Sequence, residues 1–290
     1  MGLILSLKRV TAAIGKEIFR YETLTYVLDS DGISLTGHLA VPNRVRASGT
    51  AGLVLCHGFP SGSSQGIDDD RSYYDFADLV AKALGWVVLA FTYRGCGGSE
   101  GEFSLNGWLD DTICAATELK NNPQVNSVWL AGFGTGGALA ISAASLCDEV
   151  SGVASISAPS DFHDWALDPD RLLQYWRTVG AITDPDFPQD KKSWAEEIDL
   201  IRPLEAAEKM SGKPLLVVHG ASDQVVPSFD ARVIADAHGN ADLRIIEGGT
   251  HRLRFDPSAS AIIIGWLDRT QRLATKEMTS DQYSVPEGES

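Results

Sequence analysis

The sequence predicts a single α/β domain built on an eight-stranded, mostly parallel sheet with an inserted helical cap, and three patterns support this fold class. Two alternating segments at the start are typical of an antiparallel hairpin, namely 23–28 and 33–41. Short apolar runs without alternation follow, as expected of strands buried on both faces, at 52–56, 86–92, 128–132 and 150–157. Helical patterns separate these runs, which indicates crossovers between parallel strands, at 74–84, 108–120 and 135–146.

The second half of the chain completes the predicted sheet. A strand at 214–219 precedes a helix at 228–237 that ends at Gly239, and a strand at 242–246 precedes an amphipathic helix from about Pro257. These two strands bring the expected total to eight. A length of 290 residues is compatible with one large sheet in one domain.

The segment 160–213 is expected to be a helical cap inserted into an α/β core that comprises 1–159 and 214–276. It has no strand pattern, and it carries Trp165, Trp176 and Trp194 among charged helical stretches. These tryptophans either dock the cap helices or line a ligand pocket. The acidic, serine-containing segment 277–290 is expected to be a disordered tail.

The charge of the chain limits its partners. A formal net charge of -15 argues against nucleic acid and against a membrane surface, because such partners attract Lys and Arg patches. The apolar stretch 2–7 is too short for a signal peptide, so a cytoplasmic protein is expected. The cysteines lack CxxC spacing, and we expect free thiols, no metal and no cofactor. The histidines without ligand-like pairing are His38, His163, His219 and His238.

Four distinctive segments follow predicted strands. The first is His57-Gly58-Phe59-Pro60, and the second is Gly132-Phe133-Gly134-Thr135-Gly136, which joins a strand to a helix. The last two are His219-Gly220-Ala221-Ser222-Asp223 and Gly248-Gly249-Thr250-His251. Ligands of open parallel sheets bind outside the carboxyl ends of the strands. We therefore expect these segments to converge at one site.

These segments resemble the motifs of the α/β-hydrolase family, in particular its serine esterase and serine aminopeptidase-like branch. The strand-to-helix turn has the spacing of the GxSxG nucleophile elbow, with Gly134 where the working enzymes carry the catalytic serine. The segment Arg94-Gly95-Cys96-Gly97-Gly98-Ser99 resembles the RGxGxS loop of that branch. The HGxP, HGxxD and GxxH segments match in the chain order of the family, and the match covers residues 20–275.

The resemblance implies a role for each matched position. Asp223 corresponds to the acid and His251 to the base, so Asp223 would orient the imidazole and stabilise its charged form. The backbone N–H groups of Phe59 and Thr135 would form the oxyanion hole. Gly134 tolerates the strained turn but supplies no hydroxyl. The implied activity is hydrolysis of ester, thioester or peptide-type bonds in a small acyl-type substrate.

Several functions are compatible with glycine at position 134. A water activated by Asp223 and His251 would sustain weak hydrolysis, whereas a pseudoenzyme would bind a small ligand or a partner without chemistry. A third alternative is that Gly134 replaces serine in an otherwise working esterase. Thr135 and Cys96 are poor substitutes, because the family turns the first side chain away and the second lies toward the edge of the pocket.

The same turn also satisfies the GxGxxG dinucleotide-binding pattern through Gly132, Gly134 and Gly137, with Asp161 downstream. A dinucleotide-binding unit normally places this turn after its first strand, whereas several predicted strands precede it here. The pattern also leaves Asp223 and His251 without a role. The sequence therefore favours a hydrolase-type protein over a dinucleotide-binding one.

Overall fold

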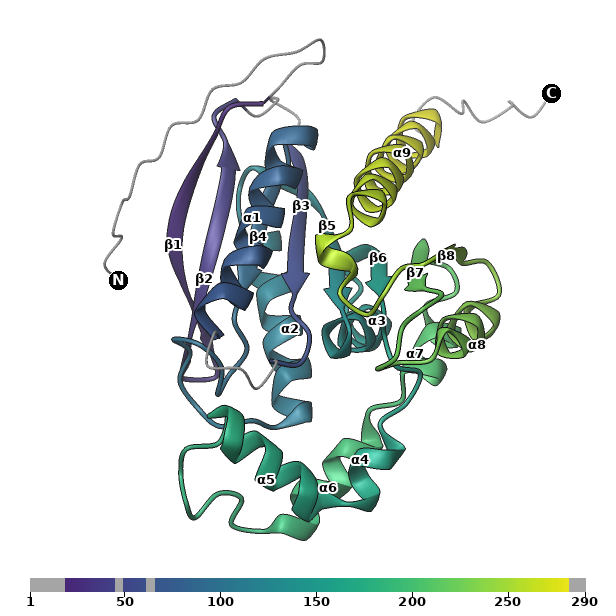
Figure 1. The fold of residues 1–290 in the computed structure, drawn as a ribbon. Coiled ribbons are helices and arrows are strands. Elements are labelled where there is room, and N and C mark those ends of the chain that lie inside the picture. Colours follow the sequence, from purple (N-terminus) through teal and green to yellow (C-terminus); the bar gives the residue numbers. More distant parts are fainter. Residues whose placement is uncertain (1–18, 45–48, 61–65, 282–290) are drawn as a thin grey trace, which may run out of the picture.

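The computed structural model describes residues 19–44, 49–60 and 66–281, and its centre is one eight-stranded sheet (Figure 1). The strand order is β1-β2-β4-β3-β5-β6-β7-β8. Strands β4, β3, β5, β6, β7 and β8 form a parallel block, and β2 is antiparallel to β1 and β4. The strands are β1 Tyr21–Ser30, β2 Ile33–Pro42, β3 Thr50–Cys56, β4 Val87–Phe91, β5 Val125–Phe133, β6 Val150–Ile156, β7 Leu215–Gly220 and β8 Asp242–Ile246.

The predicted mostly parallel sheet of eight strands is confirmed. The middle strands are apolar and buried almost throughout, as their lack of alternation predicts. Strand β1 alternates between more and less exposed positions, because it forms the edge of the sheet.

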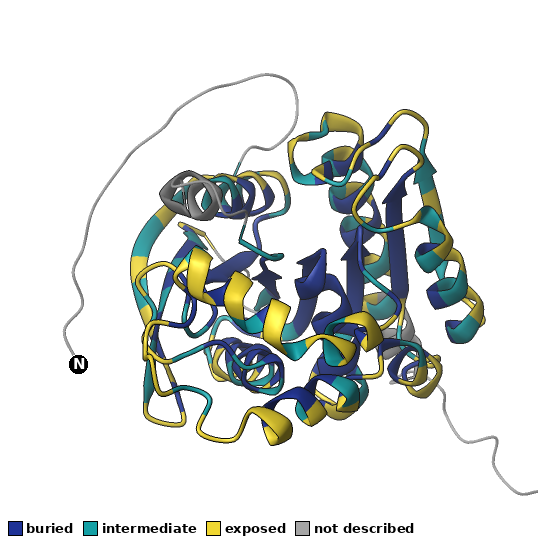
Figure 2. Ribbon diagram, turned by 60° about the horizontal axis from the view of Figure 1, so that its bottom comes forward, coloured by how far each residue is buried: buried dark blue, intermediate teal, exposed yellow. Residues whose placement is uncertain are grey.

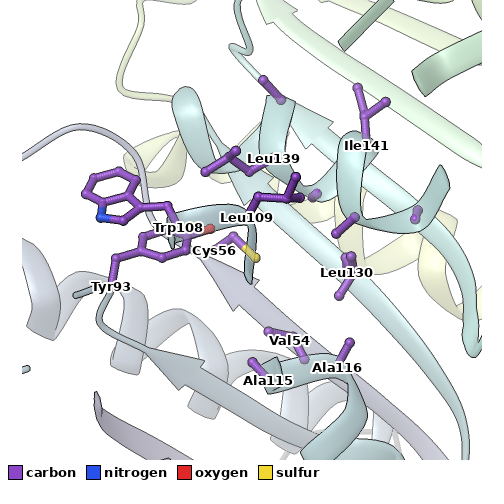
Figure 3. Packing of buried hydrophobic residues seen from close by; sticks show 14 of the residues in the cluster. Val54, Cys56, Tyr93, Trp108, Leu109, Ala115, Ala116, Leu130, Leu139 and Ile141 are labelled. Atoms are coloured by element: carbon purple, nitrogen blue, oxygen red, sulfur yellow. The ribbon is translucent and has the colours of Figure 1, made fainter. Parts of the chain in front are cut away.

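Helices cover both faces of the sheet. One face packs against α1 (Gly66–Leu84) and α9 (Pro257–Asp281), and the other packs against α2 (Leu105–Lys120), α3 (Thr135–Leu146) and α8 (Ser228–His238). Figure 3 shows the second face, where Val54 and Leu130 of the sheet lie near Ala115 of α2 and Leu139 of α3. Small side chains let α3 lie deep in the molecule, and this places its N-terminus at the end of β5.

The insertion between β6 and β7 forms four helices. They are α4 (His163–Leu167), α5 (Pro169–Val179), α6 (Lys191–Leu200) and α7 (Pro203–Lys209). Helices α4, α5 and α6 lie beyond one end of the sheet in Figure 1, whereas α7 packs against α3 and α8. Figure 2 shows that the outer surfaces of these cap helices are largely exposed, in contrast to the buried strands.

Of the three cap tryptophans, some dock the cap on the core and one lines a pocket, which are the two roles that the sequence allows. Trp176 is fully buried and stacks on Phe103 with ring centroids 3.6 Å apart, and Trp194 donates a hydrogen bond to the Phe103 carbonyl. Trp165 instead lines a cavity over the sheet. Two tryptophans therefore dock the cap and one forms a pocket wall.

The last helix is longer than the sequence analysis expects. Helix α9 continues to Asp281, five residues into the segment predicted as a disordered tail, because no proline or glycine interrupts it after Gly265. The rest of that segment lies outside the described residues. Among the described helices, none is long and apolar enough to cross a membrane.

An ion pair between Arg94 and Asp111 joins the loop after β4 to helix α2. The Arg94 guanidinium donates to both carboxylate oxygens of Asp111, with Nη2 to Oδ1 at 2.6 Å. The Arg94 backbone N–H also donates to Asp111, whose side chain is fully buried. The RGxGxS-like segment is thus fixed by a buried, multiply hydrogen-bonded carboxylate.

Removing this carboxylate is expected to destabilise the protein strongly. The Asp111→Ala substitution leaves the largely buried Arg94 charge without its partner, and should lower the free energy of unfolding by about 3–5 kcal/mol. Urea unfolding followed by circular dichroism measures this. The neighbouring Asp110→Ala is the control, because Asp110 is exposed and should change stability by less than about 0.5 kcal/mol. Equal losses in both variants would contradict the prediction.

Candidate active site

The segments that follow β3, β5, β7 and β8 meet at the carboxyl ends of the parallel strands, as predicted. They surround a cavity of about 630 Å³ whose wall is completed by residues of the cap. Gly134, Thr135, Phe59 and His251 all line this cavity. Asp223 lies behind His251 and has a fully buried side chain.

The turn between β5 and α3 is built by close backbone approach at its two outer glycines. A Cβ on Gly132 would lie 2.1 Å from the Gly136 carbonyl oxygen, and one on Gly136 would lie 2.5 Å from the Cys56 carbonyl oxygen. Gly134 at the centre has φ 55° and ψ -125°, a backbone conformation that side chains rarely adopt. The turn therefore has the strained geometry expected of an elbow.

The space beside Gly134 faces the imidazole of His251. A Cβ on Gly134 would lie 3.6 Å from His251 Nε2 and 3.7 Å from the Gly58 Cα, both ordinary van der Waals contacts. A side chain at this position is thus limited by backbone strain and not by a lack of room. A hydroxymethyl group here would reach hydrogen-bond distance of Nε2.

His251 and Asp223 form a hydrogen-bonded pair. The distance from His251 Nδ1 to Asp223 Oδ2 is 2.8 Å, and the carboxylate can only accept, so Nδ1 carries the proton. Nε2 is then the unprotonated nitrogen of the neutral ring, on the side that faces Gly134. This arrangement allows His251 to take a proton from a group in the cavity.

The ionised form of Asp223 is strongly favoured. Burial opposes ionisation, but hydrogen bonds from His219, His251 and the N–H groups of Val226 and Val225 outweigh it and lower the pKa of Asp223 below its ordinary value. The two backbone N–H groups donate to Oδ1 at 2.8 and 3.0 Å, while Oδ2 receives the histidines. Asp223 therefore stays charged behind His251.

His219 is a site residue that the sequence analysis did not pair with any partner. Its Nε2 lies 3.2 Å from Asp223 Oδ2 and 3.0 Å from the Val226 carbonyl oxygen, and both are acceptors. Nε2 is therefore protonated, donates to the Val226 carbonyl and lies within ion-pair distance of the carboxylate oxygen that His251 also contacts. His219 and Asp223 are the first and last residues of the HGxxD segment and lie four positions apart. The segment therefore brings the two residues close in sequence, but it does not show that their side chains point toward each other.

The loop after β3 presents the backbone N–H of Phe59. His57 accepts a hydrogen bond from the Tyr93 N–H on Nε2, so its Nδ1 donates to the Gly58 carbonyl oxygen at 2.7 Å. That carbonyl and the Phe59 N–H belong to one trans peptide unit and point in opposite directions. His57 thus holds the Phe59 N–H away from its own ring.

The N–H groups of Phe59 and Thr135 are available at the cavity. Among the described residues, neither group donates a hydrogen bond to a protein acceptor. Thr135 begins α3, where helix N–H groups have no intrahelical partner and the helix dipole favours negative charge. The structure therefore brings together all five site residues that the sequence analysis names.

The cavity walls contain residues that no sequence motif indicates. Beside Phe59 and Phe133 of the motif segments, aromatic side chains contribute from α1 and from the cap, namely Tyr73, Phe162, Trp165 and Tyr175. Charged residues also line the cavity, namely Asp161, Asp164 and Asp230 near α4 and α8, and Arg252 and Arg254 after β8. The Tyr175 hydroxyl donates to the Pro60 carbonyl and ties the cap to the loop after β3.

Two further residues from the sequence analysis lie near the site. Cys96 is buried and lines a small neighbouring hollow of about 90 Å³, not the main cavity. Asp161 is exposed at the cavity, where its Oδ1 accepts a hydrogen bond from the His163 N–H.

A parallel sheet with an elbow after β5 and an acid and a histidine after β7 and β8 is an α/β-hydrolase fold. The chain belongs to the alpha/beta hydrolase family, because the model of that family matches residues 53–262. Protein ABHD12B of Homo sapiens is 29% identical over 146 residues, which is 49% of this chain. The match covers 39% of the human protein's length.

Solved esterase structures have the same fold. Est1E from Butyrivibrio proteoclasticus with bound ferulic acid superposes with a TM-score of 0.62 at 22% identity, covering 85% of this chain and 97% of Est1E. The esterase Pf2001 from Pyrococcus furiosus superposes with a TM-score of 0.60 at 19% identity, covering 91% of this chain and 99% of Pf2001. At 19–22% identity, the similarity of this chain to these two esterases shows a shared fold and nothing more.

Proposed function

We propose that this protein is a weak hydrolase of ester or peptide-type acyl substrates in which a water molecule replaces the serine nucleophile. The observation that carries the proposal is the geometry at Gly134, where the space for a hydroxymethyl group faces the unprotonated Nε2 of His251. Glycine at the nucleophile position removes the covalent route. The acid and base positions and the two N–H groups remain.

The reaction follows from these groups. A water between Gly134 and His251 gives its proton to Nε2 as its oxygen attacks the acyl carbon. The N–H groups of Phe59 and Thr135 stabilise the oxyanion, and Asp223 stabilises the imidazolium. His251 then returns the proton to the leaving group. Loss of the nucleophile costs serine hydrolases about a millionfold in turnover, whereas the oxyanion hole and binding keep about a thousandfold over water, so weak turnover is expected.

An aromatic acyl group is a suitable substrate within this proposal. Phe59 and Trp165 meet edge to face with centroids 4.5 Å apart, and Phe59 and Tyr175 lie 5.3 Å apart. Such rings favour a flat aromatic ligand. Ferulic acid, which is bound in the structure of Est1E, is one candidate acid, so ethyl ferulate is a suitable first ester.

Turnover by this route should depend on His251. The His251→Ala substitution removes the general base, and we expect the rate of ester hydrolysis to fall about a hundredfold or more, which is the usual contribution of such a group. Product formation measured by chromatography tests this. The His163→Ala variant is the control, because His163 lies exposed on α4 and does not line the cavity. Unchanged turnover in His251→Ala would exclude the water mechanism.

The second candidate is a ligand-binding protein without catalysis. It is favoured by one observation: among the described residues that line the cavity, none is serine or cysteine. Under this alternative, ferulic acid or a related acid would bind in a calorimetric titration, while the matching ethyl ester would not be turned over above the rate of His251→Ala. Turnover above that rate would exclude it.

A further inference from the structure

We propose that His219 is a positioning residue for the base of this site: it fixes the Asp223 carboxylate, which in turn holds the His251 imidazole toward Gly134. The inference rests on the proposed function, because it concerns the base of the same reaction. His219 is fully buried, and the described residues that line the cavity do not include it. It therefore does not touch the substrate and acts through Asp223.

One nitrogen of the His219 ring makes its polar contacts. Nε2 donates a hydrogen bond to the Val226 carbonyl oxygen at 3.0 Å and lies 3.2 Å from Asp223 Oδ2. Among the described residues, the Nδ1 atom of this ring has no hydrogen-bond partner. The ring therefore acts through its Nε2–H group alone, and a replacement without a donor at that place removes its whole polar contribution.

Val226 links the His219 ring to the carboxylate through its backbone. Its N–H donates to Asp223 Oδ1 at 3.0 Å, while its carbonyl oxygen accepts from His219. The Val225 N–H also donates to Oδ1, at 2.8 Å. His219 belongs to strand β7, which is buried throughout. The side chain thus joins the loop that carries Asp223 to the buried centre of the sheet.

The position of Asp223 Oδ2 determines where the His251 ring lies. His251 Nδ1 is 2.8 Å from this oxygen, and the Nε2 atom of the same ring faces the Gly134 position. The His251 side chain is partly exposed, whereas the Asp223 side chain is fully buried, so the imidazole depends on the carboxylate for its orientation. A misplacement of about 1 Å costs about a hundredfold in rate, because proton transfer requires hydrogen-bond distance.

The charge of the carboxylate supports the same role for His219. Burial by itself would raise the pKa of Asp223, and the contact with His219 is the largest of the interactions that lower this pKa instead. Without the His219 donor, the buried carboxylate would keep His251 and the two backbone N–H groups as its partners. Both its position and its ionised form would therefore be less well stabilised.

The test compares two buried histidines that each donate to a backbone carbonyl. His219→Phe removes the donor but keeps a ring, and we expect the turnover of ethyl ferulate by the folded variant to fall at least about tenfold, with a smaller change in KM. His238→Phe is the matched control, because His238 Nε2 donates to the Lys213 carbonyl oxygen at 2.9 Å from the last residue of α8. The control should lose stability but keep its turnover.

Rescue by a longer amide separates positioning from packing. The amide of His219→Gln can reach the place of Nε2 and donate there, so most of the turnover should return. The shorter amide of His219→Asn ends near the place of Nδ1, and this variant should be as slow as His219→Phe. The pair also tests the inference if His219→Phe does not fold. Equal turnover by the folded glutamine and asparagine variants would contradict it.

A double substitution tests whether His219 acts through the carboxylate. In the Asp223→Asn background, His219→Phe should cause no further loss of turnover, because the group that it positions is already gone. A full additional loss, equal to the loss in the unaltered protein, would show that His219 acts by another route and would overturn the inference.

The same variants in a Gly134→Ser background separate this inference from the proposed function. There, the rate of labelling by a serine-directed phosphonate replaces turnover. If the protein with Gly134 does not exceed the His251→Ala rate, the water mechanism fails, but the labelling rates still test His219. If His219→Phe keeps its turnover, or loses no more than His238→Phe, the positioning role is wrong and the hydrolase proposal stands. If folded Gly134→Ser is not labelled either, both proposals fail.

Discussion

Gly134→Ser is expected to turn the protein into an efficient serine esterase. The new hydroxyl would lie within reach of His251 Nε2, since the Cβ position is 3.6 Å from that nitrogen. Because removal of such a nucleophile costs about a millionfold in turnover and leaves only about a thousandfold over water, we expect turnover of acyl esters to rise at least about a hundredfold. The variant should also react covalently with a serine-directed phosphonate probe, which the unaltered protein should not do.

The serine must adopt the strained backbone of the turn. Gly134 has φ 55°, which costs a residue with a side chain about 1–3 kcal/mol of stability. The gain in activity should therefore accompany a modest loss in the free energy of unfolding. Gly134→Ala is the matched control, because it carries the same strain without the hydroxyl and should neither gain activity nor be labelled.

One result would overturn this interpretation of the site. If Gly134→Ser is folded but neither hydrolyses esters nor reacts with the phosphonate, then His251, Asp223 and the two N–H groups do not form a working constellation. A ligand-binding role would then be the better account.

Asp223→Asn in the Gly134→Ser background is expected to lower turnover by about 10⁴-fold, as loss of the triad carboxylate does in serine proteases. An amide nitrogen at the Oδ2 position would donate to His251 Nδ1 instead of accepting from it, since Oδ1 is held by the Val225 and Val226 N–H groups. The imidazole would then carry its proton on Nε2 and be unable to take one from the serine. Steady-state kinetics measures the loss.

Asp223 should also make stability depend on pH. Its pKa in the folded protein is lowered from the ordinary value of about 3.9, so the ionised carboxylate stabilises the fold at pH values above 3.9. This stabilisation is lost as the pH falls below 3.9 toward the lower folded-state pKa. Urea unfolding at pH 7, 4 and 2.5 should show the unaltered protein losing its advantage over Asp223→Asn as the pH decreases. A constant difference between the two proteins would contradict the assignment of the lowered pKa.

The secondary structure follows from local patterns to a large extent. Lack of alternation predicts the buried strands, such as β3 and β7, because burial on both faces requires apolar side chains at every position. The elbow is predictable for a similar reason, since Gly132 and Gly136 are the residues that its backbone contacts demand. Helix α9 extends five residues into the predicted tail, because composition alone does not show where a helix ends.

The partners of the catalytic candidates are less accessible to sequence reasoning. No sequence pattern assigns a partner to His219, yet its Nε2 and Nδ1 of His251 both contact Oδ2 of Asp223. His57 lies in a motif, but its hydrogen bonds to Tyr93 and Gly58 depend on the loop geometry. The direction of a side chain in a loop after a strand depends on the neighbouring strands and loops. The hydrophobic periodicity of the sequence does not predict it.

The chain alone therefore establishes the fold class, the order of its elements and the positions of Gly134, Asp223 and His251 in three separate motifs. Folding places these motifs at one edge of the sheet, sets the protonated nitrogens of His219 and His251, and forms a cavity lined by α1, α8 and the cap. The reason is physical. Periodicity and turn preferences act over a few residues, whereas His251 meets Asp223 across 28 positions and Tyr175 meets Pro60 across 115. Such contacts arise only when the whole chain packs.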